Sequence, residues 1–371
     1  MAWHKNLHTW LGEYLQQSLA KFSKPSPYFD NIHVMFCVAD HYEPYVLKVD
    51  DAKAKERVLY WVNNLPLLAR RHTDSYGNNY KHNFFYPAEE YQPELLEYLA
   101  GLCQSGFGET EIHLHHDNDT PENLQRTLLD FKDTLSNEHN LLSKEKQTGT
   151  IKFGFIHGNW ALDNSHPTGR HCGVNCELQI LDDTGCYADF TMPSAPDITQ
   201  TKQINSIYYA VDDPTRPKSH NRGDNVQVGG TKNGNLLLVQ GPLSLDWRAR
   251  KRGVFPGIEN GELGGGRPPT LDRFKLWLQQ QITVEGKPDW IFIKVHTHGA
   301  LERNAAVLLG KEMDIFLSSL KLFFSSSNNL HLHYVSTREM YNIIKAAEAG
   351  ESGNPEKYRN YRIVSLMSAT K

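Results

Sequence analysis

The feature that most constrains this fold is a repeated alternation of short apolar runs with amphipathic stretches. Apolar runs at 32–39, 83–86 and 111–115 predict strands, and helical patterns at 93–103 and 121–142 follow the second and third of them. Further strands are predicted at 152–157, 186–190, 236–240, 290–296 and 330–335, with helices at 175–184, 270–282, 304–322 and 336–348. Consecutive parallel strands need a crossover connection, usually a helix, so this order predicts an α/β fold with a mostly parallel sheet.

About eight such strands favour closure into a (β/α) barrel, which a chain of 371 residues is long enough to build. We expect three parts along the chain. Residues 1–30 carry an apolar stripe at helical spacing and form a helix packed on the body, 31–350 form the barrel, and 351–371 form a C-terminal tail. The same stripe would suit a helix that lies on a membrane surface, which is the less common arrangement.

Two long polar insertions interrupt the alternation. Residues 193–234 and 249–270 are rich in glycine, proline and polar residues. Loops of this length inside a compact domain usually serve as lids or as walls of a binding site. We expect both insertions to close over the mouth of the barrel and to contact a substrate.

Composition narrows the partners and the compartment. The 39 Lys and Arg residues stand against 43 Asp and Glu, so the chain has no surplus of positive charge with which to bind nucleic acid. No apolar run approaches the roughly 18 residues that cross a bilayer, and the first residues lack the apolar core of a secretory signal. Five cysteines, an odd number, argue against a disulfide framework. We therefore expect a cytoplasmic protein without a transmembrane segment.

The ends of the predicted strands carry residue types that bind metal ions. Asp40 and His41 follow the first strand, His157 ends another, and His296 and His298 follow a late one. The carboxyl ends of parallel barrel strands converge on one mouth, so these side chains can meet there. Imidazole nitrogens and carboxylate oxygens suit zinc and related divalent ions. The sequence therefore predicts a site for a divalent metal ion, with zinc expected.

The run from His113 to Asp119 is the strongest single signal. His113 and His115 are two residues apart in a strand, so their side chains leave the same face and can bind one ion together. The alternative is that carboxylates or backbone groups satisfy these histidines. Cys172 and Cys176 form a C-x3-C pair, which predicts either half of a zinc site or two free thiols.

Roles in proton transfer follow from the same positions. Asp40 either caps the turn after the first strand or accepts a proton from an attacking water. His296, which repeats the H-x-H spacing with His298, either acts as a general acid or is a core histidine with a local partner.

The order of these motifs resembles the polysaccharide deacetylases, the NodB-like carbohydrate esterases. Val38-Ala39-Asp40-His41 is similar to the first motif of that family, and Glu111-Ile112-His113-Leu114-His115 is similar to its E-I-G-x-H motif. The segment from Phe155 to Trp160 stands where the third motif is expected. Ile293-Lys294-Val295-His296 is similar to the closing L-x-H motif. The resemblance spans about residues 30–350.

The resemblance implies a distorted (β/α) barrel of the polysaccharide deacetylase type. It also implies a metal-dependent hydrolase that removes an N-acyl group, with acetyl expected, from a sugar or polysaccharide by cleaving an amide bond. Asp40 would be the general base and His296 the general acid. The implied metal ligands are His41, His113, His115 and Asp119. The implied substrate contacts are His157, Asn159, Trp160, Tyr187 and His298.

Three departures from the family pattern leave other functions open. His41 stands where the first motif has its second acid, Asp119 stands where a second histidine is expected, and the Arg-Pro pair of the third motif is missing between Phe155 and Trp160. These departures favour a carbohydrate-binding relative without activity. The H-x-H spacing is also typical of barrel hydrolases of the amidohydrolase and PHP phosphoesterase types, although those place it on the first strand.

Overall fold

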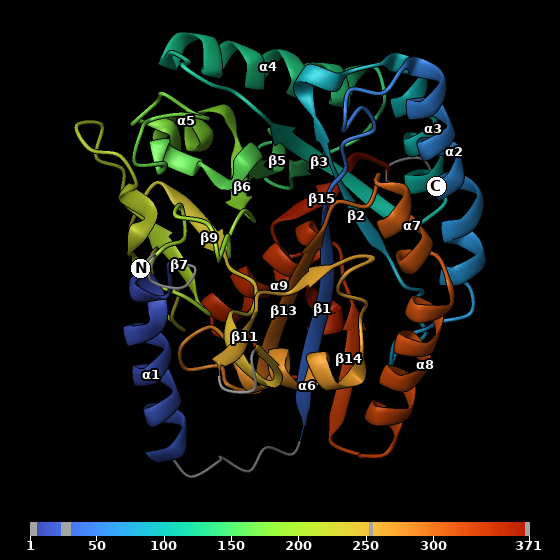
Figure 1. Cartoon of the computed structure of the whole chain (residues 1–371), viewed down its shortest axis with the longest axis vertical. Helices are drawn as coiled ribbons and strands as arrows, with labels where there is room; N and C mark the ends of the chain where they lie inside the picture. Colours follow the sequence, from blue (N-terminus) through green and yellow to red (C-terminus); the bar gives the residue numbers. More distant parts are fainter. Residues whose placement is uncertain (1–5, 24–30, 252–254, 368–371) are drawn as a thin grey trace.

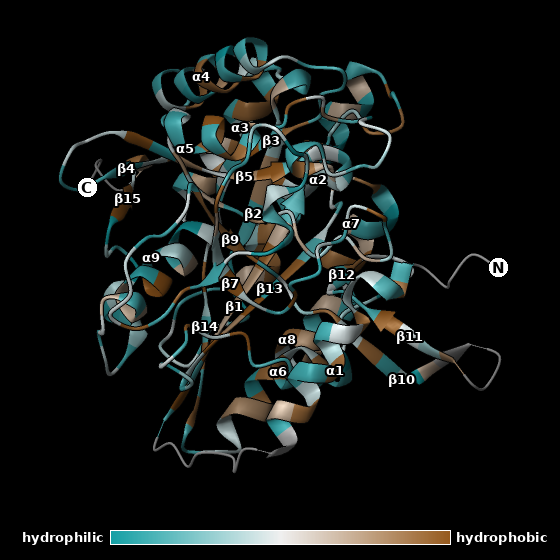
Figure 2. Ribbon diagram, turned by 90° about the vertical axis from the view of Figure 1, so that its left-hand side faces the viewer, coloured by the Kyte–Doolittle hydropathy of each residue, from teal (hydrophilic) through white to brown (hydrophobic). Residues whose placement is uncertain are grey.

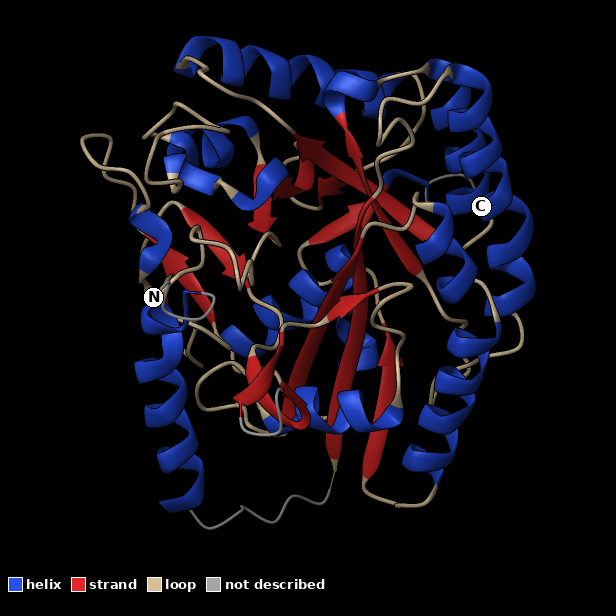
Figure 3. Cartoon of the chain, in the orientation of Figure 1, coloured by secondary structure: helices blue, strands red, loops and turns tan. Residues whose placement is uncertain are grey.

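The computed structural model describes residues 6–23, 31–251 and 255–367 and confirms an α/β fold with a mostly parallel central sheet. Figures 1 and 3 show the strands at the centre with helices outside them. The helices are α1 (Leu7–Ser23), α2 (Asp51–Ala69), α3 (Pro93–Gln104), α4 (Pro121–Asn137), α5 (Glu177–Thr184), α6 (Leu271–Gln279), α7 (Glu302–Leu308), α8 (Lys311–Ser325) and α9 (Thr337–Glu348). The strands of the main sheet are β1 (Ile32–His41), β2 (His82–Pro87), β3 (Gly108–Leu114), β4 (Ser143–Glu145), β5 (Ile151–His157), β6 (Cys186–Asp189), β7 (Ile207–Ala210), β8 (Asp224–Asn225), β9 (Leu236–Val239), β12 (Glu262–Leu263), β13 (Trp290–Thr297), β14 (Leu330–Tyr334) and β15 (Ile363–Ser365), and β10 (Ser244–Lys251) pairs with β11 (Phe255–Glu259) in a separate hairpin.

The sheet is open rather than closed. Its strands follow the order β12-β13-β1-β2-β3-β5-β6-β9-β7-β8, and within the described part of the chain no hydrogen-bonded pair joins the two ends of this path. The predicted closure into a barrel is therefore not seen. Neighbouring strands in the series β1, β2, β3, β5, β6 and β9 nonetheless pair in parallel, as the alternation with helices requires.

β1 lies at the centre of the sheet. It pairs with β13 along one edge, and along the other edge it pairs first with β14 and then with β2. β14 pairs with Ile32 to Phe36 of β1, whereas β2 pairs with Ala39 to His41, so the sheet divides between these two segments. Because β1, β2, β3, β5 and β13 run parallel, their carboxyl ends lie at one edge of the sheet.

Alternate residues of these strands face two different apolar layers. Val34, Phe36 and Val38 of β1 pack with α2, α3 and α8 in the larger cluster. Met35 and Cys37 face the opposite way and pack with α9. Figure 2 shows the hydrophobic residues concentrated along these central strands. We call the side of the sheet that faces the first layer the outer face, and the side that faces the second layer the inner face. Successive residues of a strand point to opposite faces, so a polar residue at a strand end can join a site on only one of them.

Local signals explain why several helices begin where they do. The carboxylate of Asp50 accepts the backbone N–H of Lys53 at the start of α2, and Thr120 does the same for Asn123 at the start of α4. Ser336 and Glu339 form a capping box at the start of α9. These caps fix the direction in which each chain segment leaves the preceding strand.

The N-terminal helix lies against the body. Trp10 of α1 is fully buried and packs with Ala195, Ile204 and Leu243. Among the described residues, no helix is long and apolar enough to cross a membrane.

The two polar insertions occupy different positions. Part of 193–234 joins the sheet, because β7 pairs with both β9 and β8. The β10–β11 hairpin, which begins before the insertion at 249–270 and continues into it, extends away from the rest of the molecule in Figure 2. The following strand β12 pairs with β13 beside His296. Of the two insertions, this last segment is the part that the pairing places beside a predicted catalytic residue.

Candidate functional site

Five polar side chains gather on the inner face at the carboxyl ends of β1, β3 and β13. We call them the His41 centre: His41, Glu43, His113, His115 and His298. One ligand atom each of His41, Glu43 and His298 lies within 4.8 Å of the others, and the same is true of Glu43, His113 and His115. Glu43 thus belongs to both groups and joins them. The prediction that His113 and His115 face one point agrees with this geometry, since both rings reach the Glu43 carboxylate.

Hydrogen bonds fix the orientation of two of these rings. Nδ1 of His113 lies 2.8 Å from the carbonyl oxygen of Ile156, and Nδ1 of His115 lies 2.5 Å from Oε1 of Glu89. Carbonyl and carboxylate oxygens only accept, so both Nδ1 atoms carry the proton. In the neutral rings each Nε2 then presents a lone pair, and these atoms lie 3.3 and 3.6 Å from Oε1 of Glu43. The two Nε2 atoms and Glu43 are therefore held together either by a proton on an imidazole or by a bound cation.

His41 lacks a partner for its inward nitrogen. The side chain is 2% exposed, and its Nε2 has no hydrogen-bond partner among the described residues. Its ring lies 4.8 Å from that of His298 and 5.0 Å from that of His113, measured between centroids. Burial and the neighbouring histidines hold the pKa of His41 well below its usual range, so this ring is neutral and can accept.

The charge of Glu43 is set by its histidine neighbours. Burial alone would raise the pKa of Glu43, but the hydrogen bond from His113 and the nearby His298 and His115 lower it below the usual value. Glu43 is therefore ionised within a group of imidazoles. Nitrogen and oxygen donors of this kind are what a divalent cation takes from a protein.

His296 lies on the same inner face as His41 but is not part of the group. It pairs with Ala39 across the β1–β13 ladder, its ring centroid is 6.2 Å from that of His41, and its Nδ1 has no partner within the described chain. Burial and the nearby Lys294 hold the pKa of His296 well below its usual range. The predicted general acid is thus next to the His41 centre.

Asp40, the predicted general base, points the other way. It precedes His41 in β1, so its side chain enters the outer face. Its Oδ1 accepts the backbone N–H of Gly299 at 2.6 Å, and its Oδ2 lies 2.8 Å from Nε2 of His82. Both oxygens of this fully buried carboxylate are therefore engaged away from the His41 centre.

Asp119 and His157 belong to a separate cluster rather than to the His41 centre. Oδ2 of Asp119 lies 3.0 Å from Nδ1 of His116, and Oδ1 accepts from Thr120 and Asn123. Asp119 is thus no neighbour of His113 or His115 in this arrangement. The ladder pairs His157 with Leu114 on the outer face, because β3 and β5 run in parallel register.

The remaining predicted substrate residues differ in their surroundings. The Trp160 ring lies 6.5 Å from His41 and 6.2 Å from His298 between centroids, so it forms a wall of the centre. Asn159 is exposed beside it. Tyr187 is only 6% exposed, and its hydroxyl donates to Glu111 at 2.6 Å within the core. Tyr187 lies in the inner apolar layer, where its ring packs against that of Tyr341 of α9, and this differs from the predicted sugar-stacking surface.

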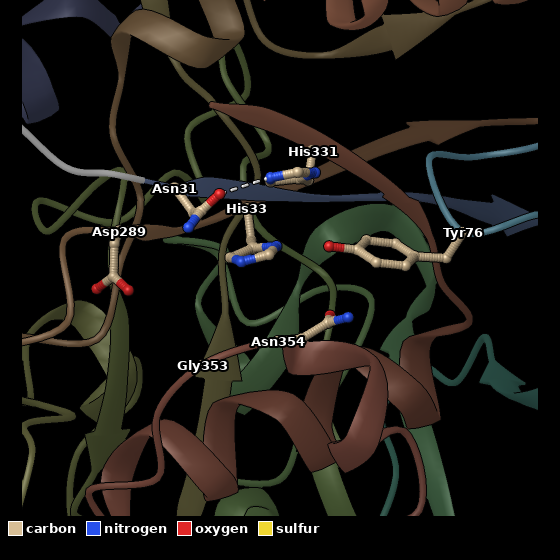
Figure 4. A pocket seen from close by; sticks show the side chains of 7 residues that line it. All are labelled: Asn31, His33, Tyr76, Asp289, His331, Gly353 and Asn354. Atoms are coloured by element: carbon tan, nitrogen blue, oxygen red, sulfur yellow. Dashed lines mark hydrogen bonds between the residues drawn. The ribbon is translucent and has the colours of Figure 1, made fainter. Parts of the chain in front are cut away.

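A second group of histidines lies at the other edge of the sheet, where β1 and β14 begin. Figure 4 shows Asn31 hydrogen-bonded to His331, with the Tyr76 hydroxyl directed toward His33, around a cavity of about 380 Å³. Nearby, Asp74, His333 and Glu356 also bring ligand atoms together.

This last group already has a resident cation. Nη2 of Arg359 lies 3.1 Å from Asp74, and its Nε lies 2.7 Å from Glu356. The guanidinium balances both carboxylates, so the group needs no metal ion. The His41 centre differs, because among the described residues Glu43 forms ion pairs with histidines alone.

Sequence reasoning missed Glu43 and the part played by His82. A signal for Glu43 was present, since it stands two residues after His41 and the same rule of alternation was applied to His113 and His115. No such signal pointed to His82, because it stands at the start of β2, whereas the candidate residues were sought at the carboxyl ends of strands. The assembled centre can hold a divalent cation through nitrogen and oxygen donors, with a neutral imidazole beside it.

No protein-family model matches the chain, and a search of curated proteins returns no match.

Proposed function

We propose that the His41 centre binds a divalent metal ion and that the protein is a metal-dependent hydrolase. The observation that carries the proposal is the meeting of nitrogen and oxygen ligand atoms. His113 and His115 engage their Nδ1 atoms away from the centre and turn Nε2 toward an ionised Glu43, and the inward nitrogen of buried His41 has no partner among the described residues. A cation satisfies all of these atoms at once.

The residues present fit such an ion. Each oriented histidine donates its other ring N–H to a carbonyl or a carboxylate, which is the usual support for a metal-bound imidazole. His41, Glu43, His113, His115 and His298 would hold the ion. A divalent ion in such a site polarises the carbonyl oxygen of a substrate and acidifies a water molecule.

The protein's own side chains supply the remaining steps in this proposal. His296, whose Nδ1 has no partner among the described residues, would pick up the proton that the attacking water releases and give it to the leaving nitrogen of an amide. Trp160 would form an apolar wall against a sugar ring. Asp40 would act as a positioning residue, because its Oδ1 holds the backbone N–H of Gly299 and so the loop that carries His298.

The substrate class rests on the resemblance. The order of the Asp40-His41, His113–His115 and His296 motifs supports a divergent member of the polysaccharide deacetylases with a distorted, open barrel. We therefore propose hydrolysis of an N-acyl group, with acetyl as the first candidate, from a sugar or polysaccharide.

Metal content and acetate release test the proposal together. The protein is purified without chelator, its metals are measured by elemental analysis, and it is assayed over N-acetylated sugars. His113→Ala should lose most of the metal bound at this centre and the acetate release. His139→Ala, which removes a histidine bonded to Tyr91 away from the centre, should keep both. Equal metal content and equal activity in the two variants would exclude the proposal.

A further inference from the structure

Four side chains from successive segments meet on the outer face, beside the ends of β3 and β5. They are His116 after β3, His157 at the end of β5, Cys172 in the loop that follows, and Glu177 in the first turn of α5, and we call them the His116 cluster. One ligand atom of each lies within 4.8 Å of all the others. Nε2 of His116 lies 2.8 Å from Nε2 of His157, and the two nitrogens lie 3.3 and 3.5 Å from Oε1 of Glu177.

The protons of both rings are committed elsewhere. Nδ1 of His116 lies 3.0 Å from the carboxylate of Asp119, and Nδ1 of His157 lies 2.5 Å from the carbonyl oxygen of Gly158. These oxygens only accept, so both Nδ1 atoms are the donors. In the neutral rings, the two Nε2 atoms then turn lone pairs toward each other and toward Glu177. Lone pairs at 2.8 Å repel, so either a proton on one of the two rings or a metal ion lies among these atoms.

The carboxylate of Glu177 has no ordinary counter-charge. The side chain is fully buried, and within the described ranges its ion pairs are with His116 and His157 alone. Several other buried carboxylates are paired with a guanidinium, as Glu109 is with Arg338 and Asp74 is with Arg359. Oε2 of Glu177 accepts the backbone N–H of Asp163 at 2.6 Å, so Oε1 is the oxygen that a protonated His116 or a bound metal ion would compensate.

Cys172 adds a sulfur donor. Burial and the nearby Glu177 raise the pKa of this thiol, which donates to Oε2 of Glu177 at 3.4 Å, and a bound metal ion would remove its proton. The backbone N–H groups of Asn164 and Val174 lie 3.3 and 3.4 Å from its Sγ and donate to it. The backbone of Asp119 donates to the carbonyl oxygen of Cys172 at 2.9 Å, which brings this loop against the residues after β3. Two imidazoles, one thiolate and one carboxylate are donor types that zinc accepts, and four is the number of ligands in its structural sites.

We propose that the His116 cluster binds a zinc ion that fastens the loop between β5 and α5 to the ends of β3 and β5. The inference is separate from the proposed hydrolase activity and shares no ligand with the His41 centre. Its consequence for that centre is indirect. The fastened loop begins with Gly158 and Trp160, and Trp160 faces His41 and His298. A metal clip on a loop of this length restricts the unfolded chain and stabilises the fold.

Cobalt substitution tests the cluster without reference to activity. The full chain is stripped of metal, reduced, and titrated with Co²⁺ under anaerobic conditions. A thiolate bound to cobalt gives a charge-transfer band in the near ultraviolet. The His41 centre contains no sulfur, so this band reports on the His116 cluster alone. We expect the band in the wild-type protein and in Glu43→Gln, and we expect Cys172→Ser to lose it.

Cys176→Ser is the matched control and should keep the band, because Cys176 is only four residues away and lies outside the cluster. If Cys172→Ser fails to fold, Glu177→Gln serves in its place and should weaken cobalt binding at least tenfold. Cobalt binding without a band, or loss of the band in Cys176→Ser, would overturn the inference. An absent band together with cobalt binding that Glu43→Gln abolishes would overturn this inference and leave the proposed hydrolase centre standing.

Discussion

Nε2 of His82 lies 2.8 Å from Oδ2 of Asp40, and this contact joins the start of β2 to the end of β1 on the outer face. The other oxygen of Asp40 accepts the N–H of Gly299, while the carbonyl oxygen of Gly299 accepts from Nε1 of Trp61 at 2.9 Å. The Gly299 peptide is thus held from both sides. A Cβ at position 299 would lie 2.0 Å from Asp40, so the close approach requires glycine. The loop that carries His298 is therefore positioned by groups that do not belong to the His41 centre.

Asp40 and His82 should be coupled in stability. Each is fully or almost fully buried, so Asp40→Asn and His82→Asn should each lower the free energy of unfolding by about 1–3 kcal/mol. The double variant should be less destabilised than the sum of the two by about 0.5–3 kcal/mol, measured by urea unfolding. The prediction would be contradicted if the two effects added strictly. If Asp40→Asn also kept the stability of the wild type but lost most of its turnover, Asp40 would be assigned the role of general base.

Replacement of His296 should affect amides more than esters. An amine leaves poorly without a proton, whereas an alkoxide needs less help, so His296→Asn should slow release from an N-acetylated sugar about 100-fold. Release from the O-acetylated analogue of the same sugar should fall much less. Paired rate measurements on the two substrates check this. Equal losses on both would assign His296 to substrate or metal binding instead.

Acid should weaken the fold through His33. Burial, followed by the neighbouring His333 and His331, lowers the pKa of His33 from 6.5 to about 3. Between these two values the unfolded chain binds the extra proton and the folded chain does not, so the stabilisation is complete above pH 6.5 and falls as the pH drops toward 3.

The groups that face His33 are His331 and His333 of β14, Tyr76, and Lys287 before β13. His33→Gln should therefore lose less stability than the wild type between pH 6.5 and 5. A single group contributes at most about 1.4 kcal/mol per pH unit, and His33 less than this because its ring lines a cavity that opens to the surface. Urea unfolding at several pH values measures it, with the exposed His8→Gln as control. Parallel curves for wild type and His33→Gln would contradict the prediction.

The buried pair of Arg338 and Glu109 should be expensive to break. The guanidinium of Arg338 in α9 contacts both oxygens of Glu109 in β3 at 2.8 to 3.1 Å, and Arg338 is 4% exposed. Arg338→Met leaves a buried carboxylate without its partner and should cost about 3–5 kcal/mol of unfolding free energy. Replacing both residues, as Arg338→Met with Glu109→Leu, should restore much of this loss.

Thermal unfolding measures both variants, with the exposed Arg362→Met as control. A double variant as unstable as Arg338→Met alone would show that the ion pair is not the source of the loss.

Periodicity predicted most of the strands and helices but could not decide how the sheet ends. Helix α2 was missed because Asn63, Asn64 and Pro66 interrupt its helical pattern, yet Trp61 and Leu65 bury its apolar side in the core. The helix predicted at 304–322 is divided into α7 and α8 around Gly310. Closure of a barrel depends on which strands pair at long range, and local sequence does not encode that pairing.

The candidate site was predicted in its residue types but less well in its grouping. The rule of alternation brought His113 and His115 together correctly. Applied to Asp40 and His41, the same rule separates them, because neighbours in a strand face opposite layers. Asp119 stands near the histidines in sequence, but it turns to His116 at the start of α4. Closeness in sequence indicated which residues lie near one another along the chain. Which of them share a site depends on the face of the strand to which each side chain points and on the long-range register between strands.

His115 and His116 are consecutive residues, yet their rings serve different faces. Nε2 of His115 approaches Glu43, while Nε2 of His116 approaches His157. A strand slipped by one residue exchanges its two faces, so an insertion or deletion within 108–116 would send each imidazole to the wrong side. Point substitutions at apolar positions of β3 change volume without changing this phase. We therefore expect β3 to tolerate a change of side chain far better than a change of length, even where the altered strand still packs.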